Sequence, residues 1–430
     1  MKPVAFPFSR VETIMRFATS PVTGPSAVAR SSTESATAPQ AVRFGDTLFH
    51  SVEEAQWDGA VEASRARGVT LTPLASTASA SRLHVVVQKG RLFQQEHPTV
   101  PVLLDKGRYL VVDLTEAAAR MCDHGDRPCY SVRPLAAFTT AFDTRAAAAD
   151  RAAPLPWVKA LVDQIPRASY EADLTHLVGF GTRHSTSTQY VAAANWARDQ
   201  FQALGFATSL QTIAVNGKPS QNVVAEKVGN GPTPRGVVIV GAHLDSINIA
   251  GGPAAPAPGA DDDGSGSAGG LAIARVLKDF SAENDLRVLL FGGEEEGLFG
   301  SKKYVASLSA TERSRIRAVV HMDMIASLNS PAPTVLLEGA ALSQTVIDGL
   351  AAAAATYTGL AVQTSLHPFN SDHVPFLDAG VPAVLTIEGT DDANHNIHSA
   401  EDTLAHINWE LALDILRMNV AFVAQTLGQG

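Results

Sequence analysis

Three adjacent carboxylates, Asp261–Asp263, interrupt a glycine-rich stretch in the middle of this chain. Like charges this close repel one another, so the cluster needs either bulk water or a bound cation. A β-branched apolar run over residues 236–241 precedes it and leads to His243 and Asp245, and helix-forming residues follow from Ala268. The pattern predicts a buried strand with polar residues at its tip, then an acidic loop, then a helix. A solvated acidic turn is the alternative reading of the loop alone.

Two other kinds of glycine-rich or acidic loop do not fit this segment. A phosphate-binding loop needs Gly-Lys-Ser/Thr after its glycines, and no such triplet follows here. A calcium loop that began at Asp261 would need a glutamate at its twelfth position, where Ala272 stands.

Further potential ligands follow three more apolar runs that read as strands. The runs over residues 286–291, 318–322 and 383–387 are followed, respectively, by Glu294–Glu296, by Asp323, and by Glu388 with a loop that carries His398. Helical patterns separate these runs, so we expect an α/β fold with a mostly parallel central sheet and helices on both faces. In such sheets the carboxyl ends of the strands form the functional edge.

These residues make a set of two histidines and three carboxylates that suits zinc, or else cobalt or manganese. The set contains His243, one aspartate of the 261–263 triplet, Glu295, Asp323 and His398; spacing alone does not choose among the three aspartates, and His321 shares a strand face with Asp323. One shared carboxylate would bridge two ions, which activate a water molecule between them. Glu294 is placed to act as general base. Asp245 is placed to orient the imidazole of His243.

Composition limits the other classes of function. The chain has 430 residues, 45% of them hydrophobic and 18% charged, and a formal net charge of −10. This charge argues against nucleic acid as a partner, and no apolar run is long enough to cross a membrane. The N-terminus has no sustained apolar segment typical of a secretory signal. The two cysteines, Cys122 and Cys129, are expected to form a local disulfide if the protein is exported.

Changes in composition divide the chain into four parts. Residues 1–42 read as a disordered or leader segment, 43–142 as a small α+β module, 143–156 as an exposed linker and 157–430 as the catalytic domain. Arg145 and Arg151 are candidate protease sites in the linker.

From about Pro154 to the C-terminus the chain resembles the co-catalytic di-zinc aminopeptidases of the bacterial leucyl aminopeptidase type, clan MH. The resemblance rests on the order and the residue sequence of these motifs: His243-Leu-Asp245, Asp261-Asp262-Asp263-Gly-Ser-Gly, Glu294-Glu295-Glu296-Gly, Met322-Asp323-Met324, Ser371-Asp372-His373 and His398-Ser-Ala-Glu-Asp402. It implies a zinc-exopeptidase fold, of the phosphorylase/hydrolase-like type, and an enzyme that removes N-terminal residues from peptides.

The resemblance also assigns roles to residues. One zinc ion would bind His243 and Asp323, the other Glu295 and His398, with Asp262 shared, and Glu294 would be the general base. It further implies a secreted or periplasmic protein whose residues 43–142 are a propeptide, and a preference for apolar N-terminal residues. We expect a monomer whose N-terminal module packs on the peptidase domain.

One departure from the family concerns the substrate carbonyl. Several relatives carry a tyrosine near the pocket, whereas here His367 and Phe369 precede Ser371, so His367 is a hypothetical substitute. Three alternative functions stay open: a carboxypeptidase of the same fold, a glutaminyl cyclase-like enzyme with one zinc ion, and a binding protein that has lost catalysis.

Overall fold

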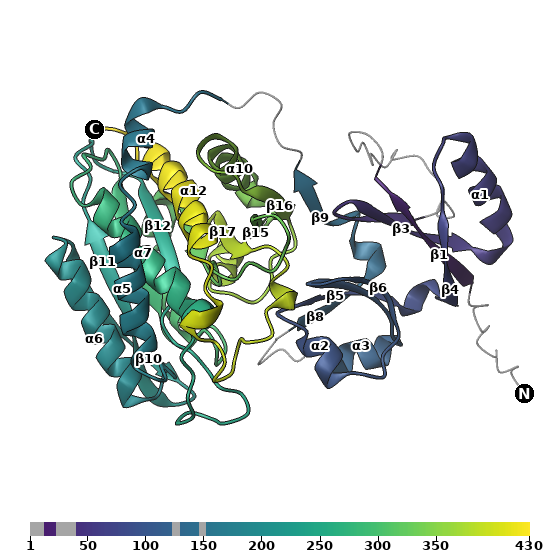
Figure 1. Ribbon diagram of the computed structural model, residues 1–430, viewed down its shortest axis with the longest axis horizontal. Coiled ribbons are helices and arrows are strands. Elements are labelled where there is room, and N and C mark those ends of the chain that lie inside the picture. The colour runs from purple at the N-terminus through teal and green to yellow at the C-terminus, as the bar shows by residue number, and fades with distance from the viewer. Residues whose placement is uncertain (1–12, 23–39, 123–129, 146–151) are drawn as a thin grey trace, which may run out of the picture. The chain divides into compact units, whose positions relative to one another are not determined.

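A computed structural model describes residues 13–22, 40–122, 130–145 and 152–430 of the chain. Contacts within the chain divide these residues into two units. The first unit contains residues 13–22, 40–88, 92–122 and 130–143, and the second contains residues 89–91, 144–145 and 152–430. Figure 1 shows the elements of both.

A mixed sheet forms the centre of the second unit. Its strand order is β10 (Ala207–Val215), β11 (Lys218–Lys227), β13 (Asp285–Phe291), β12 (Val237–His243), β14 (Ile316–Met322), β17 (Ala383–Glu388), β15 (Thr334–Gly339) and β16 (Ala361–Ser365). The middle strands β13, β12, β14 and β17 run parallel, and both β11 and β15 run antiparallel to their inner neighbours. The prediction of a largely parallel sheet is confirmed.

The register of the parallel strands gathers the polar residues at one edge. His243 pairs with Phe291, and Met322 pairs with Thr386, so the chain leaves these strands at similar heights. The residues that follow the strands, including Glu294 and Asp323, therefore start from the same edge of the sheet. The sequence reason is the pattern of β-branched residues, which form strands that are buried on both faces.

Helices cover both faces of this sheet. Val238 and Val240 of β12 belong to a core with α4 (Pro156–Val162), α5 (Arg167–Val178), α6 (Thr188–Ala203), α7 (Gly266–Leu277), α10 (Gln344–Tyr357) and α12 (Trp409–Leu427). Val237 and Ile239 point to the opposite face, as alternation requires, and share a second core with α8 (Phe299–Ser307) and α11 (Val374–Asp378). The short helix α9 (Ala310–Arg315) precedes β14. In Figure 1, α5, α7 and α12 run alongside one another over the first of these faces.

The first unit is a small α+β module with two sheets. One contains β9 (Thr140–Arg145), β2 (Gln40–Phe44), β3 (Thr47–Glu53), β1 (Ile14–Pro21) and β4 (Thr72–Ser79), and the other contains β6 (Val102–Lys106), β7 (Tyr109–Asp113), β5 (Leu83–Gln88) and β8 (Tyr130–Pro134). Its helices are α1 (Trp57–Ala66), α2 (Leu92–Glu96) and α3 (Glu116–Cys122). Across both units, single 3₁₀ turns occupy Glu54–Gln56, Ala80–Arg82, Leu135–Ala137, Ala341–Ser343, Asp391–Ala393 and Leu404–His406.

The structure corrects the predicted N-terminal boundary. Residues 14–21, expected within a disordered or leader segment over residues 1–42, form β1, and β2 begins at Gln40. The strand is ordered because β1 pairs with both β3 and β4 and buries Phe17 and Ala18. The leader prediction concerns residues 1–12 and 23–39 as well, and these lie outside the described residues.

The predicted linker and disulfide lie partly outside the described residues. Residues 143–145 of the expected 143–156 linker belong to β9, where Arg145 donates a hydrogen bond to Asp348 at 2.6 Å. Residues 146–151, including Arg151, are not described. Cys122 is buried at the end of α3, and its predicted partner Cys129 is not described, so the disulfide stays a prediction.

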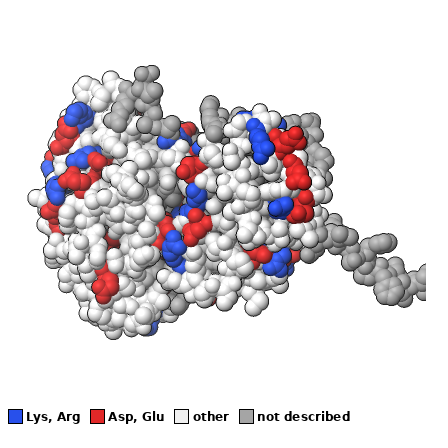
Figure 2. Space-filling model, turned by 45° about the vertical axis from the view of Figure 1, so that its right-hand side comes forward, with Lys and Arg blue, Asp and Glu red and all other residues white. Residues whose placement is uncertain are grey.

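The charged surface of the described residues shows no large basic area on the face seen in Figure 2. Lysine and arginine side chains lie interspersed with aspartate and glutamate there. Among the described residues, no helix has the length and apolar character needed to cross a membrane.

The N-cap of α12 provides a test of the fold. Asn408 accepts a hydrogen bond from Leu411 N at 3.0 Å and so satisfies one of the free N–H groups at the start of this 19-residue helix. Asn408→Ala should lower the free energy of unfolding by about 1 kcal/mol, whereas Asn408→Asp should keep the cap. Urea unfolding followed by circular dichroism measures both; equal midpoints for Asn408→Ala and the wild type would contradict the role of this cap.

Candidate metal centre

Two histidines from distant parts of the chain face the same carboxylate. His243 is the last residue of β12, and its Nε2 lies 3.0 Å from Oδ1 of Asp262. His398, in the loop after β17, places its Nε2 3.1 Å from the other oxygen of Asp262, Oδ2. Asp262 therefore lies between the two imidazoles with one oxygen directed to each.

Each imidazole also faces a second carboxylate. Oδ1 of Asp323 lies 3.6 Å from Nε2 of His243, and Oε2 of Glu295 lies 3.0 Å from Nε2 of His398. The side chains of all five residues are at most 7% exposed. The structure thus brings together the full set of residues that the sequence singled out.

Hydrogen bonds from backbone and amide N–H groups distinguish Asp262 from its two neighbours. The carboxylate of Asp261 accepts bonds from Ala326 N and from Asn394 Nδ2, each at 2.9 Å. The carboxylate of Asp263 accepts bonds from the backbone N–H groups of His243, Gly266 and Met324 at 3.0, 3.0 and 3.2 Å. These two aspartates hold the loop in place, and Asp262 is the one whose carboxylate faces the histidines.

The backbone of the acidic loop has an anchor of its own. Asp402 accepts hydrogen bonds from Asp261 N at 2.9 Å and from Asp262 N at 3.0 Å, one to each carboxylate oxygen. Residues Ala260–Ser265 form an irregular turn in which Asp262 and Asp263 leave helical geometry. This irregular path directs Asp262 away from its neighbours and toward the histidines.

The structure also separates His321 from Asp323. His321 is fully buried in β14 against Phe291, with ring centroids 6.2 Å apart, and burial lowers the pKa of its imidazole to about 3. It is therefore neutral and packs in the sheet. Asp323 lies one residue beyond the strand, faces His243, and accepts a hydrogen bond from Ser371 Oγ at 2.8 Å.

Asp245 lies beside His243 but contacts it mainly through its backbone. His243 Nδ1 donates to the carbonyl oxygen of Asp245 at 3.1 Å, whereas the carboxylate oxygen lies 3.7 Å away. Because a carbonyl only accepts, Nδ1 carries a hydrogen, and Nε2 is the ring nitrogen that faces the site. The carboxylate instead accepts hydrogen bonds from Glu294 N and Glu295 N at 3.3 and 3.2 Å, and so fixes the turn after β13.

Glu294 is buried at the edge of the cluster. Glu294 is 4% exposed, and its Oε1 has no hydrogen-bond partner among the residues that the structure describes. Burial raises the pKa of this carboxyl well above its usual value, against the opposing effect of Lys89 and His243. A buried carboxyl that exchanges a proton is the kind of group that acts in general acid–base chemistry.

The electrostatics of the cluster favour a cation. Burial alone would lower the pKa of His243 and of His398, but nearby carboxylates, chiefly Glu294 and Glu295 respectively, raise both pKa values well above the usual range. A lysine lies against the cluster: Lys89, which belongs to the second unit by its contacts, places Nζ 3.4 Å from Asp262 Oδ2. An excess of buried negative charge therefore remains to be compensated.

The donor atoms themselves fit a metal ion. Buried atoms that have no hydrogen-bond partner among the described residues include His243 Nε2, Asp262 Oδ2, Glu295 Oε1, Asp323 Oδ1 and His398 Nε2. Ligand atoms of His243, Asp262 and Glu295 all lie within 4.8 Å of one another. Buried polar atoms are normally bonded, and imidazole nitrogens with carboxylate oxygens are the donors that zinc binds.

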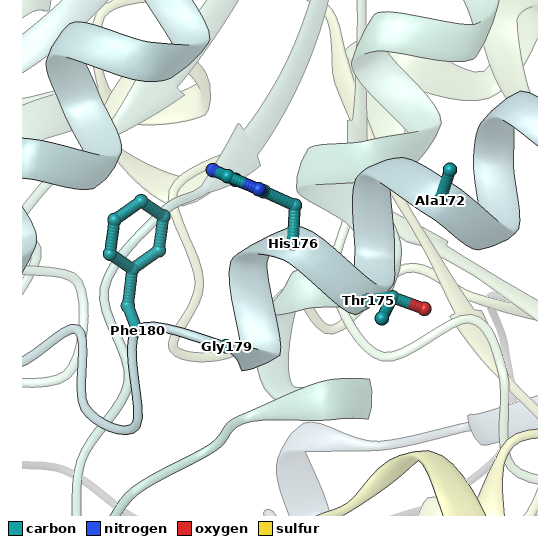
Figure 3. Close-up of a pocket in the computed structure, with 5 residues that line it drawn as sticks. All are labelled: Ala172, Thr175, His176, Gly179 and Phe180. Atoms are coloured by element: carbon teal, nitrogen blue, oxygen red, sulfur yellow. The ribbon is translucent and has the colours of Figure 1, made fainter.

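A surface pocket elsewhere in the second unit has a different character. Ala172, Thr175, His176, Gly179 and Phe180 line it, and all belong to α5 or follow it directly. Figure 3 shows His176 and Phe180 side by side, and the ring of His176 stacks on Trp196 at 4.5 Å. No residue of the carboxylate and histidine cluster lines this pocket, so the candidate chemistry does not depend on it.

The sequence did not predict the role of three residues that contact the cluster or the segments that carry it. Lys89 lies in a segment with no recognisable motif, Asp402 was noted only as part of a motif, and Arg183 is an isolated arginine in a polar loop. Asp402 had a usable signal in its place four residues after His398. Neither Lys89 nor Arg183 had one, because their contacts depend on the folding of distant segments.

Part of the chain matches a known family of peptidases. Residues 222–423 match the model of peptidase family M28. Leupeptin-inactivating enzyme 1 of Streptomyces exfoliatus is 32% identical over 293 residues, which are 62% of this chain and 63% of that protein. Aminopeptidase YwaD of Bacillus subtilis is 31% identical over 205 residues, 47% of this chain and 44% of that protein. The chain thus covers less than two thirds of the length of both relatives.

Solved structures share the fold. The Legionella pneumophila LapA aminopeptidase superposes with a TM-score of 0.57 at 19% identity, covering 81% of this chain and 99% of that one. A zinc aminopeptidase from Bacillus subtilis gives 0.55 at 18% identity, covering 62% and 96%, and Porphyromonas gingivalis glutaminyl cyclase gives 0.51 at 19%, covering 61% and 98%. The resemblance to zinc aminopeptidases is confirmed at the level of family. The segment that matches peptidase family M28, residues 222–423, carries every residue of the cluster from His243 to His398.

Proposed function

We propose that this protein is an aminopeptidase that binds two zinc ions at the cluster around Asp262. The observation that carries the proposal is the direction of the two imidazoles, because each Nε2 faces a different oxygen of one carboxylate. A site for a single ion would not need a carboxylate between two histidines. His243 and Asp323 would hold one ion, His398 and Glu295 the other, and Asp262 would contact both.

The residues around the proposed ions have different roles in hydrolysis. Two zinc ions supply an activated water and stabilise the negative charge that develops on the substrate carbonyl oxygen. Glu294 is proposed as the general base, since it is buried, adjacent to Glu295 and has an unpaired oxygen. Asp245 positions Glu294 and Glu295 through their backbone N–H groups.

The proposed substrates are peptides with a free N-terminus, with a preference for apolar first residues. Two exposed apolar side chains support this preference. Ile249 donates its backbone N–H to the carbonyl of His398 at 3.1 Å and is 56% exposed, and Leu328, five residues beyond Asp323, is 44% exposed. The names of several relatives as leucine aminopeptidases agree with it.

Export and processing are part of the proposal. We place the protein in the periplasm or outside the cell, acting as a monomer, with residues 43–142 as a propeptide. The division of contacts between Asp143 and Thr144 supports a separable first unit. Mass spectrometry of the N-terminus of the protein recovered from culture medium tests export and removal of the propeptide together.

Removal of the bridging carboxylate should lower the metal content. Asp262→Asn keeps the size of the side chain but removes its charge and one oxygen acceptor, so we expect a loss from two zinc ions to one or none per chain. Elemental analysis after dialysis measures this, with the exposed Asp279→Asn as the matched control. Two retained zinc ions in Asp262→Asn would argue against a bridge. One zinc ion in the wild type would instead favour a cyclase-like site.

Loss of the general base should abolish turnover without loss of metal. Glu294→Gln is expected to lower kcat/KM for leucyl-p-nitroanilide by roughly 10²- to 10⁴-fold, the usual contribution of a positioned acid–base group, while two zinc ions remain bound. Glu295→Gln, one residue away, should lose both metal and activity.

The wild-type enzyme should not cleave a substrate whose N-terminus is acetylated. Rapid cleavage of such a substrate would contradict the requirement for a free N-terminus.

A further inference from the structure

Arg183 is an unusual buried cation. It is 0% exposed and is the largest fully buried side chain among the described residues. No carboxylate of the described residues lies within ion-pairing distance of its guanidinium, which donates only to backbone carbonyl oxygens. Burial of a charge without a direct counter-ion lowers the stability of the folded protein. The burial of Arg183 therefore needs a structural or functional explanation.

The carbonyl acceptors belong to the segments that deliver the metal ligands. Nε donates to Leu244 O at 2.8 Å, directly after His243. Nη1 donates to Pro258 O at 2.5 Å and Nη2 to Gly259 O at 2.8 Å, at the start of the acidic loop. One rigid guanidinium plane therefore ties the end of β12 to the loop that carries Asp262.

A second set of bonds reinforces this tie. Arg183 N donates to Ser246 Oγ at 3.0 Å, and Ser246 Oγ donates in turn to Ala257 O at 2.7 Å. Gly259 adopts a φ of 53°, and a Cβ there would meet Ser246 Cβ at 2.5 Å and Arg183 Nη2 at 3.0 Å. The two segments are therefore packed as closely as a glycine allows.

The positive charge of Arg183 interacts with the carboxylates of the cluster and of the loops around it. Burial lowers the pKa of its guanidinium, but Asp402, Asp263 and Asp245 raise it, and an arginine stays protonated in a folded protein. Its field offsets part of the repulsion among the carboxylates that the loop must hold together.

We propose that Arg183 is a positioning residue for the metal centre, which fixes the spacing of His243 and Asp262 by bridging the carbonyl groups behind them. The proposal rests on the two-zinc assignment made above. It gives a role to the geometry of the guanidinium and not to its charge alone, because a lysine ammonium has one nitrogen and cannot span three carbonyl groups along the same plane.

Metal binding by Arg183→Met and Arg183→Lys tests the proposal. Both variants should bind zinc roughly 10- to 100-fold more weakly than the wild type, the range for loss of a residue that supports a metal ligand. Zinc competition with a chromogenic chelator measures the affinity, and the absorption bands of the cobalt-substituted protein report the ligand geometry. Arg275→Met is the matched control, because Arg275 pairs with Asp173 at 3.0 Å and contacts no ligand segment.

The thermal midpoint with and without added zinc separates positioning from general destabilisation, since a weaker site gives a smaller stabilisation by the metal. Should Arg183→Met fail to fold, Arg183→Lys and Ser246→Ala answer the same question, with Ser246→Ala expected to weaken zinc binding as well. Wild-type zinc affinity and an unchanged cobalt spectrum in the folded Arg183 variants would overturn the proposal. Absence of zinc from the wild type would instead overturn the metal assignment itself.

Discussion

The concentration of buried negative charge at one edge of the sheet is the constraint on which the rest of this structure depends. Asp261, Asp262, Asp263, Glu294 and Asp323 lie within a small volume and are each at most 4% exposed. Water cannot solvate these groups, so every carboxylate must find a hydrogen-bond donor or a cation. Most of the loops after the parallel strands can be understood as ways to supply those donors.

The three aspartates of the acidic loop meet this constraint with different partners. Asp261 and Asp263 take backbone and amide N–H groups, and in doing so they shape the loop. Asp262 takes none of these, and its two oxygens face the imidazoles of His243 and His398, with the ammonium of Lys89 beside them. Because neutral donors fix two of the carboxylates, the third is left to face the two histidines.

The sequence predicted the fold of the second unit well because strand and helix patterns there are local. The parallel strands lead to the expected histidine and acidic residues. Which aspartate faces the histidines depends on the hydrogen bond that Ala326 N donates to Asp261 and on the bond that the Asp402 carboxylate accepts from Asp261 N. Both partners lie more than 60 residues away from the loop, and only the family resemblance indicated Asp262. The strand β1 was missed because its stability comes from pairing with β3 and β4, which a single short segment does not reveal.

The positions of the ligands also explain why the centre combines rigid and irregular parts. His243 ends a strand held on both sides by parallel neighbours, so its position is fixed by the sheet. His398 lies in a loop and adopts a φ of 56°, an uncommon conformation for a residue with a side chain. Such strain persists where surrounding contacts impose it and where function benefits from it. A bridging carboxylate between one fixed and one loop-borne imidazole requires that the acidic loop itself be held firmly, which is the work of Asp402 from one side and Arg183 from the other.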